Sequence, residues 1–213
     1  VRQNISVDFQ SNSLPVLVDA NGEVPIPLTV GVEDTRLQLN PDSFGFNNLG
    51  MDIVSSRLAK RSEKGIVGVN LGANKDSDDR IKDYVKVLKC CGPFVDFATV
   101  NVSSPNTENL RNLQEKSSLN NLLYQVMSSR ENLKNKVPIF LKIAPDLSLN
   151  QIDDISEIAL KMQIDAVVAT NTTLDHQGLK SYVKNKQGGL SGKPLFSKST
   201  WVLANLSRRL EKR

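Results

Sequence analysis

The chain has few of the residues that build metal centres and disulfide bridges. Of its 213 residues, one is histidine and two are cysteine. His176 lies in a polar stretch where a loop is expected, so we interpret it as a solvated loop residue rather than an acid–base group. Cys90 and Cys91 are adjacent on a predicted helix, where a structural disulfide is geometrically poor. The sequence therefore predicts packing cysteines, a reducing compartment and no metal site.

Long apolar runs and export signals are also missing. No run reaches the roughly 18 apolar residues that span a bilayer, and the first residues carry no signal-peptide pattern. Val1 is not a starting methionine, so a preceding segment is compatible with the sequence. The formal net charge is +4, yet lysine and arginine are scattered except at 208–213, which we interpret as a solvated helix end. We expect a globular cytoplasmic protein without a nucleic-acid partner.

Short apolar runs alternate with helical periodicity along the chain. Each run is long enough for one buried strand, and the expected strands are 65–71, 94–102, 137–143 and 166–170. The expected helices are 77–91, 118–134, 149–163 and 198–210. The third helix is the clearest, because Ser148 and Gln151 form a capping box before its apolar face. Strand and helix repeat in units of roughly 30 to 40 residues, which predicts right-handed βαβ crossovers and a parallel sheet, either closed as a barrel or open.

Polar residues stand at or just beyond the apolar ends of all four predicted strands. They are Asn70, Asn101, Lys142 and the segment 170–172. Because both barrel and open α/β folds place their sites at the carboxyl ends of the strands, this coincidence predicts a functional site there.

Lys142 lies inside the apolar segment PIFLKIAP. An unpaired ammonium group would be costly to bury, so we expect an anionic partner. The partner is either a carboxylate of the fold, with Asp146 the nearest candidate, or an anionic cofactor, which we favour.

The segment NVSSPNT at 101–107 places hydroxyl groups between two amides. Asparagine offers both a donor and an acceptor, so Asn101 and Asn106 can match the donors and acceptors of a planar imide ring. Pro105 ends the strand and stiffens the loop. The same residue types also dominate ordinary turns, and the other segments favour the site.

The motifs GVNLGANK, VNVSSPNT, FLKIAPDL, VVATNTT and GGLSGKPL occur in this order between residues 68 and 195. Together with FGFNNLGMD at 44–52, they resemble the quinone-dependent, class 2 dihydroorotate dehydrogenases. The resemblance implies a (β/α)8 TIM barrel that holds FMN and oxidises dihydroorotate to orotate in pyrimidine biosynthesis. It also implies a quinone as electron acceptor and peripheral attachment to the inner face of the cell membrane.

The resemblance also implies roles for single residues. Ser104 would be the base that takes the ring proton, and a serine rather than a cysteine at this position indicates class 2. FMN would be held by Asn70, Asn101, Lys142, Thr170 and Gly192. The pyrimidine would be held by Asn101, Asn106, Asn171 and Thr172. A lysine suits FMN because reduced flavin carries negative charge that a fixed cation stabilises.

The chain departs from the family pattern at both ends. Residues 1–43 diverge, with Ala20 where the family carries a substrate-contacting lysine and Asp42 where an asparagine is expected. The recognisable core runs over 44–203, and the last two barrel strands are expected to be missing. We therefore expect a single, partial barrel domain spanning 1–213.

Three functions fit these observations. The first is the quinone-dependent dehydrogenase with Ser104 as its base. The second is a non-enzymatic remnant of that enzyme that binds FMN weakly or not at all. The third is another FMN barrel, such as a tRNA dihydrouridine synthase, which the NVSSPNT motif argues against.

Overall fold

The computed structural model describes residues 50–61, 65–74, 77–104, 110–177 and 188–210. Before residue 50 it describes only three short strands, β1 (Ser6–Asp8), β2 (Val16–Val18) and β3 (Ile26–Pro27). These strands pair antiparallel in the order β1-β2-β3.

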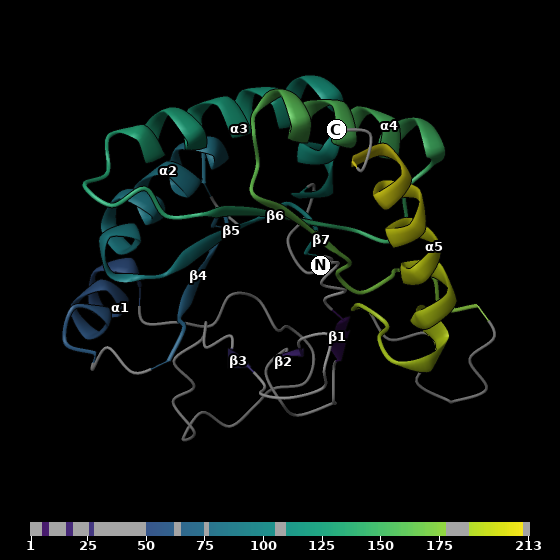
Figure 1. Cartoon of the computed structure of the whole chain (residues 1–213), viewed down its shortest axis with the longest axis horizontal. Coiled ribbons are helices and arrows are strands. Elements are labelled where there is room, and N and C mark those ends of the chain that lie inside the picture. Colours follow the sequence, from purple (N-terminus) through teal and green to yellow (C-terminus); the bar gives the residue numbers. More distant parts are fainter. Residues whose placement is uncertain are drawn as a thin grey trace.

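The main sheet has four parallel strands in the order β4-β5-β6-β7 (Figure 1). They are β4 (Gly68–Leu71), β5 (Phe97–Asn101), β6 (Ile139–Ile143) and β7 (Ala166–Ala169). Neighbouring strands are joined by α2 (Arg80–Cys91), α3 (Lys116–Glu131) and α4 (Leu149–Lys161). Each connection is a βαβ crossover, because parallel neighbours cannot be linked by a tight hairpin.

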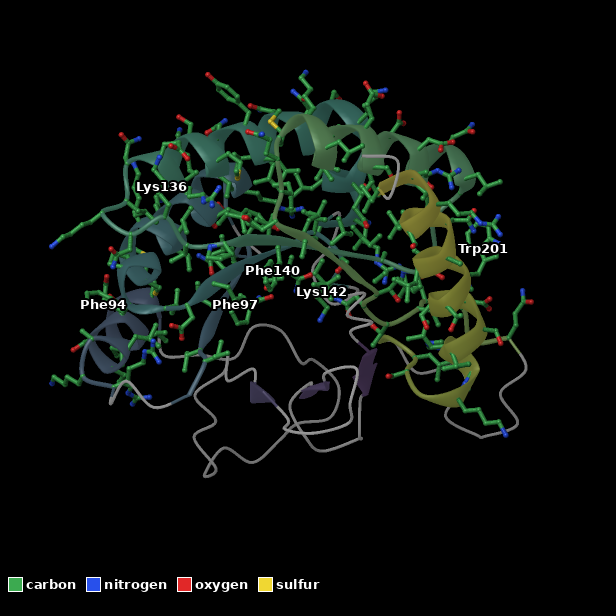
Figure 2. The ribbon with its side chains drawn as sticks, in the orientation of Figure 1. Phe94, Phe97, Lys136, Phe140, Lys142 and Trp201 are labelled. Atoms are coloured by element: carbon green, nitrogen blue, oxygen red, sulfur yellow. The ribbon has the colours of Figure 1, made fainter. Side chains whose placement is uncertain are left out.

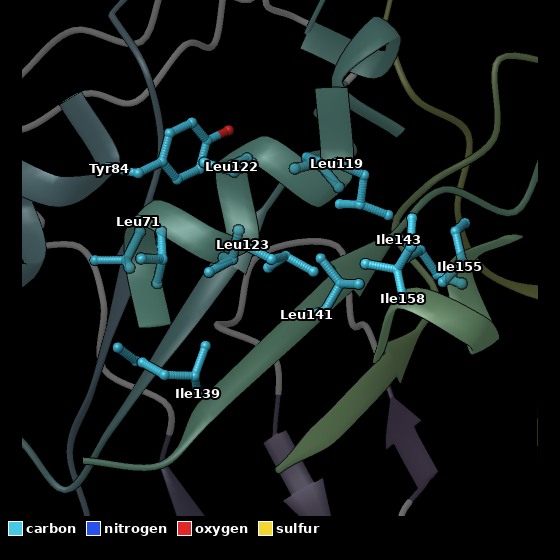
Figure 3. Packing of buried hydrophobic residues seen from close by; sticks show 14 of the residues in the cluster. Leu71, Tyr84, Leu119, Leu122, Leu123, Ile139, Leu141, Ile143, Ile155 and Ile158 are labelled. Carbon is cyan, nitrogen blue, oxygen red and sulfur yellow. The ribbon is translucent and has the colours of Figure 1, made fainter. Parts of the chain in front are cut away.

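The three crossover helices cover one face of the sheet (Figure 1). On that face the strands present an unbroken apolar surface, since side chains alternate along a strand. Its central members are fully buried, and Figure 3 shows them packed against leucines of α3 and isoleucines of α4. The buried strand and helix residues include Leu71, Leu119, Leu122, Leu123, Ile139, Leu141, Ile143, Ile155 and Ile158.

Two more helices flank this layer. The first, α1 (Met51–Leu58), lies beside α2, where the Ser55 hydroxyl donates a 2.8 Å hydrogen bond to the Cys90 carbonyl. The last, α5 (Lys193–Leu210), packs on α4 and β7. Leu195, Val202 and Leu206 are its buried residues.

The predicted strands and crossover helices are confirmed, with shifted ends. Both hydrogen bonds of the predicted capping box at the start of α4 are present. The Gln151 backbone N–H donates to the Ser148 hydroxyl oxygen, and the Gln151 side-chain oxygen accepts from the Ser148 backbone N–H. The predicted strand over 94–102 begins too early, because Gly92–Phe94 forms the 3-10 helix η1 around Pro93. The last helix begins at Lys193 rather than 198. The helix α1 was not predicted, because its eight residues show no clear apolar stripe at helical spacing.

Four consecutive strand–helix units, β4-α2, β5-α3, β6-α4 and β7-α5, follow one another around the sheet. This is the arrangement of a (β/α)8 barrel. Within the described residues the main sheet is open, with β4 and β7 at its edges. The predicted incomplete barrel is thus the observed fold class.

Candidate functional site

The sheet face turned away from the crossover helices, which we call the inner face, carries the polar residues. Strand register places Asn101 directly beside Lys142, and Lys142 beside Val168. One level closer to the amino ends, Asn70 is paired with Thr99. Figure 2 shows Lys142 pointing from the inner face, on the side opposite α3. Asn70, Asn101 and Lys142 therefore share one face of the sheet.

Toward the amino ends from Asn101 and Lys142, the inner face carries two aromatic rings. Phe97 and Phe140 stack with ring centroids 4.9 Å apart and planes 21° apart. Gly68 of the neighbouring strand leaves room for them, because a Cβ there would lie 2.2 Å from the Phe97 ring. The rings form an apolar stack toward the amino ends of β5 and β6, below Asn101 and Lys142, with Phe140 on the same level as Asn70.

Ser103 joins the loops that follow β5 and β7. Its hydroxyl donates to the side-chain oxygen of Asn101 at 2.9 Å and accepts from the side-chain nitrogen of Asn171 at 3.0 Å. Its backbone N–H also donates to the Asn101 oxygen at 3.2 Å. Ser103 and Asn101 are buried. These bonds fix the orientation of both amides and bring the two predicted pyrimidine-binding loops together.

The loop after β7 is ordered by its own side chains. The Asn171 oxygen accepts from the Thr172 backbone N–H at 2.7 Å, and the Thr170 hydroxyl donates to the Asn171 carbonyl at 2.9 Å. Thr173 then pairs with Leu190 through two backbone hydrogen bonds of 3.0 and 2.7 Å. This pairing brings the segment with Gly192 alongside the β7 loop, and Gly192 adopts a φ of 76° that favours glycine.

Lys142 is held largely away from water by the inner face. Burial lowers the pKa of its ammonium group below the ordinary value, because a low-dielectric environment disfavours the charged form. A cation that is desolvated in this way, beside the Asn101 amide, suits an anionic or electron-rich ligand.

Asp146, the candidate carboxylate partner of Lys142, forms a separate cluster. Its two oxygens accept hydrogen bonds from the Arg111 and Lys198 side chains, the Thr173 hydroxyl and the Leu174 backbone N–H. Burial raises its pKa, but these four bonds together outweigh that effect and lower the pKa to about 2. Four donors fill the acceptor positions of a carboxylate.

The remaining predicted residues are placed as follows. Ser104 follows Ser103 directly and is partly buried. Asn106 lies outside the described residues, as do Ala20 and Asp42. His176 is in a loop as expected, but it is partly buried, and its ring nitrogen Nε2 lies 3.1 Å from the Gly188 carbonyl.

Sequence reasoning missed two residues of this region. Ser103 was treated only as a neighbour of Ser104, although its hydroxyl links the two asparagines. Arg111, in the 3-10 helix η2 (Leu110–Gln114), contacts three strand-end loops. The only signal for Arg111 was a single cation in the otherwise uncharged segment LRNLQ, which is too weak to identify it.

Comparison with known proteins finds a matching family model and related proteins. The family model described as "Dihydroorotate dehydrogenase" matches residues 25–213. The protein named dihydroorotate dehydrogenase (quinone) of Cereibacter sphaeroides is 51% identical over 190 residues, which cover 89% of this chain and 53% of that protein. Its namesake in Rhodopseudomonas palustris is 50% identical over 173 residues, covering 78% and 48%. The chain thus spans about half the length of these relatives.

Solved structures agree with the sequence relatives. The crystal structure of DHODH from Eimeria tenella in complex with ferulenol has a TM-score of 0.73 to this chain and 32% identity, covering 79% of this chain and 52% of that one. The ligand-free form has the same TM-score of 0.73 and covers 78% and 54%. Among the described residues, no helix is both long and apolar enough to cross a membrane. By its sequence match, its relatives and its fold, the chain belongs to the dihydroorotate dehydrogenase family, and the bacterial relatives named above are of the quinone-dependent kind.

Proposed function

We propose that this chain carries the flavin-facing and pyrimidine-facing residues of a quinone-dependent dihydroorotate dehydrogenase. One observation carries the proposal. Lys142 and Asn101 stand side by side on the inner face, while Ser103 links Asn101 to Asn171 across the adjoining loops. A desolvated cation and two oriented amides thereby converge on one small region at the carboxyl ends of β5, β6 and β7.

These groups fit the isoalloxazine ring of FMN. The ring is planar, and its reduced form is electron-rich, which a buried ammonium group stabilises without reorganisation. The carbonyl end of the Asn101 amide is already held by Ser103, so we expect its NH2 end to face the ring. Asn70, Thr170 and Gly192 would complete the cofactor contacts. FMN, when bound, supplies the acceptor for the hydride that leaves the dihydropyrimidine ring.

The chain's own residues would bind and deprotonate the substrate. Asn171, Thr172, Asn101 and Asn106 would hold the pyrimidine through its alternating donors and acceptors. Ser104 would take the ring proton at its hydroxyl oxygen as the C–H bond breaks. A serine is a weak base at its ordinary pKa, so a neighbouring hydroxyl or water must share that proton. Electrons would then pass to a quinone, at a membrane surface to which the protein attaches peripherally.

The test is an anaerobic titration of the purified chain, reconstituted with FMN. Dihydroorotate should bleach the yellow absorbance, and a soluble quinone analogue should restore it. Ser104→Ala should keep the colour and lower the bleaching rate by a factor of about 100 or more.

Ser129→Ala is the matched control for this experiment. Ser129 is a buried serine of α3 whose hydroxyl makes no hydrogen bond within the described part of the chain. The FMN of the Ser129→Ala variant should bleach as fast as that of the unchanged protein. A chain that never takes up FMN would favour the non-enzymatic remnant, and a Ser104→Ala chain with an unaltered rate would refute the base assignment.

A further inference from the structure

Arg111 connects three loops that leave the carboxyl ends of three adjacent strands. Its Nε donates to the Ser103 carbonyl at 3.3 Å and its Nη2 donates to the Thr172 carbonyl at 2.9 Å. Its Nη1 forms a 2.8 Å ion pair with Asp146. The side chain is 18% exposed, so these bonds are made largely out of water.

The two carbonyls that Arg111 binds belong to the loops of the proposed site. The Ser103 carbonyl is part of the peptide bond that leads into Ser104, and the Thr172 carbonyl follows Asn171 in the β7 loop. A guanidinium group is flat and presents its donors in a rigid fork. Arg111 therefore bonds to both backbones at once, and a second link between the same loops is the 3.0 Å bond from Asn171 to the Ser103 hydroxyl.

Asp146 anchors the guanidinium group from the third loop. One of its oxygens accepts from Arg111 and from the Leu174 N–H, and the other accepts from Thr173 and Lys198. The carboxylate thus balances the charge of Arg111 and also holds the β7 loop and α5. Removing its charge would loosen Arg111 without changing Arg111 itself.

We propose that Arg111 is a positioning residue, which holds the Ser103–Ser104 backbone at a fixed distance from the Asn171–Thr172 backbone. Its effect on the reaction rests on the proposed function, because it acts through Ser104 and the pyrimidine-binding residues. Its effect on the loops does not depend on flavin or substrate.

Arg130 provides a matched control near the amino ends of the strands, away from the loops that Arg111 joins. It is 17% exposed, donates to the Val137 carbonyl at 2.8 Å and pairs with Asp165 at 3.6 Å. Asp165 in turn accepts from the Ile139 N–H at 2.7 Å, just as Asp146 accepts from the Leu174 N–H. The two arginines therefore have similar burial and similar partners, but Arg130 lies at the amino ends of β6 and β7.

The first measurement is amide hydrogen exchange of the flavin-free chain, comparing Arg111→Lys with Arg130→Lys. Lysine keeps the charge but replaces the flat guanidinium fork, whose three nitrogens each bind a different loop, with a single nitrogen at the end of a flexible stem. Arg111→Lys should speed exchange at the Ser103, Thr172 and Leu174 amides about tenfold, and leave the Ile139 amide unchanged. Arg130→Lys should speed exchange at the Ile139 amide and leave the three loop amides unchanged. Equal exchange at the loop amides in both variants would overturn the proposal.

The second measurement separates positioning from general destabilisation in the FMN-loaded chain. Arg111→Lys should lower kcat about 10- to 100-fold, with a smaller change in KM and unchanged flavin content, because the reacting groups are misplaced rather than lost. Arg130→Lys should leave both kcat and KM unchanged. A kcat loss of the same size in both variants would show that Arg111 acts only through stability.

Asp146→Asn keeps the experiment decisive if Arg111→Lys fails to fold. It should speed exchange at the Ser103 and Thr172 amides, and unchanged exchange there would overturn the proposal. If the unchanged chain is not reduced by dihydroorotate, the proposed function fails, while the exchange comparison still decides the role of Arg111 in the loops.

Discussion

The buried hydroxyl of Tyr84 donates a 2.8 Å hydrogen bond to the backbone carbonyl of Asn101. Tyr84 lies on α2 and is fully buried, and Asn101 is the last residue of β5. The bond ties the helix layer to the carboxyl end of the strand, immediately before the loop with Ser103 and Ser104.

Tyr84→Phe should lower the free energy of unfolding by about 1 to 2 kcal/mol, because it leaves the Asn101 carbonyl buried without this donor. Urea denaturation followed by circular dichroism measures the change. Tyr124→Phe on α3 is the control, since Tyr124 is 62% exposed. Equal losses in the two variants would contradict the role assigned to the buried bond.

The same tyrosine should affect stability at alkaline pH. Burial raises the pKa of Tyr84 above its ordinary value, so the folded chain retains a proton that the unfolded chain gives up near pH 10. Its contribution to the free energy of unfolding is complete below about pH 10 and is lost as pH rises further. Tyr84→Phe should remove this part of the alkaline decline, which thermal denaturation at several pH values can measure.

Lys142→Met should weaken the binding of FMN and change how the stability of the flavin-free chain depends on pH. The dissociation constant of FMN should rise about tenfold or more, because a charge-assisted contact is lost. Burial lowers the folded-state pKa of Lys142, so its contribution to the free energy of unfolding increases with pH up to about 10.4, the unfolded value. The methionine variant should lack that increase. A flavin titration and melting curves at two pH values test both effects.

Asp146 should influence stability at acidic pH. Its folded pKa of about 2 lies below the ordinary value of 3.8, despite the opposing effect of burial. Its contribution is therefore present above about pH 4 and disappears as pH falls through about 2. Asp146→Asn should be less stable at neutral pH, and the difference from the unchanged chain should shrink between pH 4 and 2. A constant difference over this range would contradict the ionic network.

Gly68→Ala should destabilise the chain by about 1 to 3 kcal/mol, because the new methyl group overlaps the Phe97 ring. The ring cannot move freely, since it is stacked on Phe140. Phe97→Leu in the same chain should recover part of the loss by making space. If Gly68→Ala alone melts like the unchanged chain, the aromatic layer is looser than the structure indicates.

Much of the scaffold was predictable, because local patterns specify it. The β-branched runs ending at Leu71, Asn101, Ile143 and Ala169 gave the four strands and their order along the chain. Ser148 marked the start of α4 through its capping box. The strand predicted from Phe94 was wrong at its start because Pro93 and Gly92 favour a tight helical turn there.

The site was predictable only in part. The sequence placed Asn70, Asn101 and Lys142 at the ends of predicted strands, whereas the strand register of the fold decides that they share one face. The contacts of Ser103 and Arg111 could not be predicted. The two bonds that reach the β7 loop, from Arg111 to Thr172 and from Asn171 to Ser103, join residues 61 and 68 positions apart in the chain, and no local pattern encodes such a separation.

By itself, the sequence determined the alternating strands and helices, the polar strand ends and the family, because these depend on short-range periodicity and on contiguous motifs. Only the tertiary structure decided which hydrogen bonds those polar groups make. Asp146 binds Arg111 and Lys198 in a cluster of its own, and Ser103 orients one asparagine at the end of β5 and another in the loop after β7. Such choices depend on which donors the packed helices and loops bring within about 3 Å, the reach of a hydrogen bond.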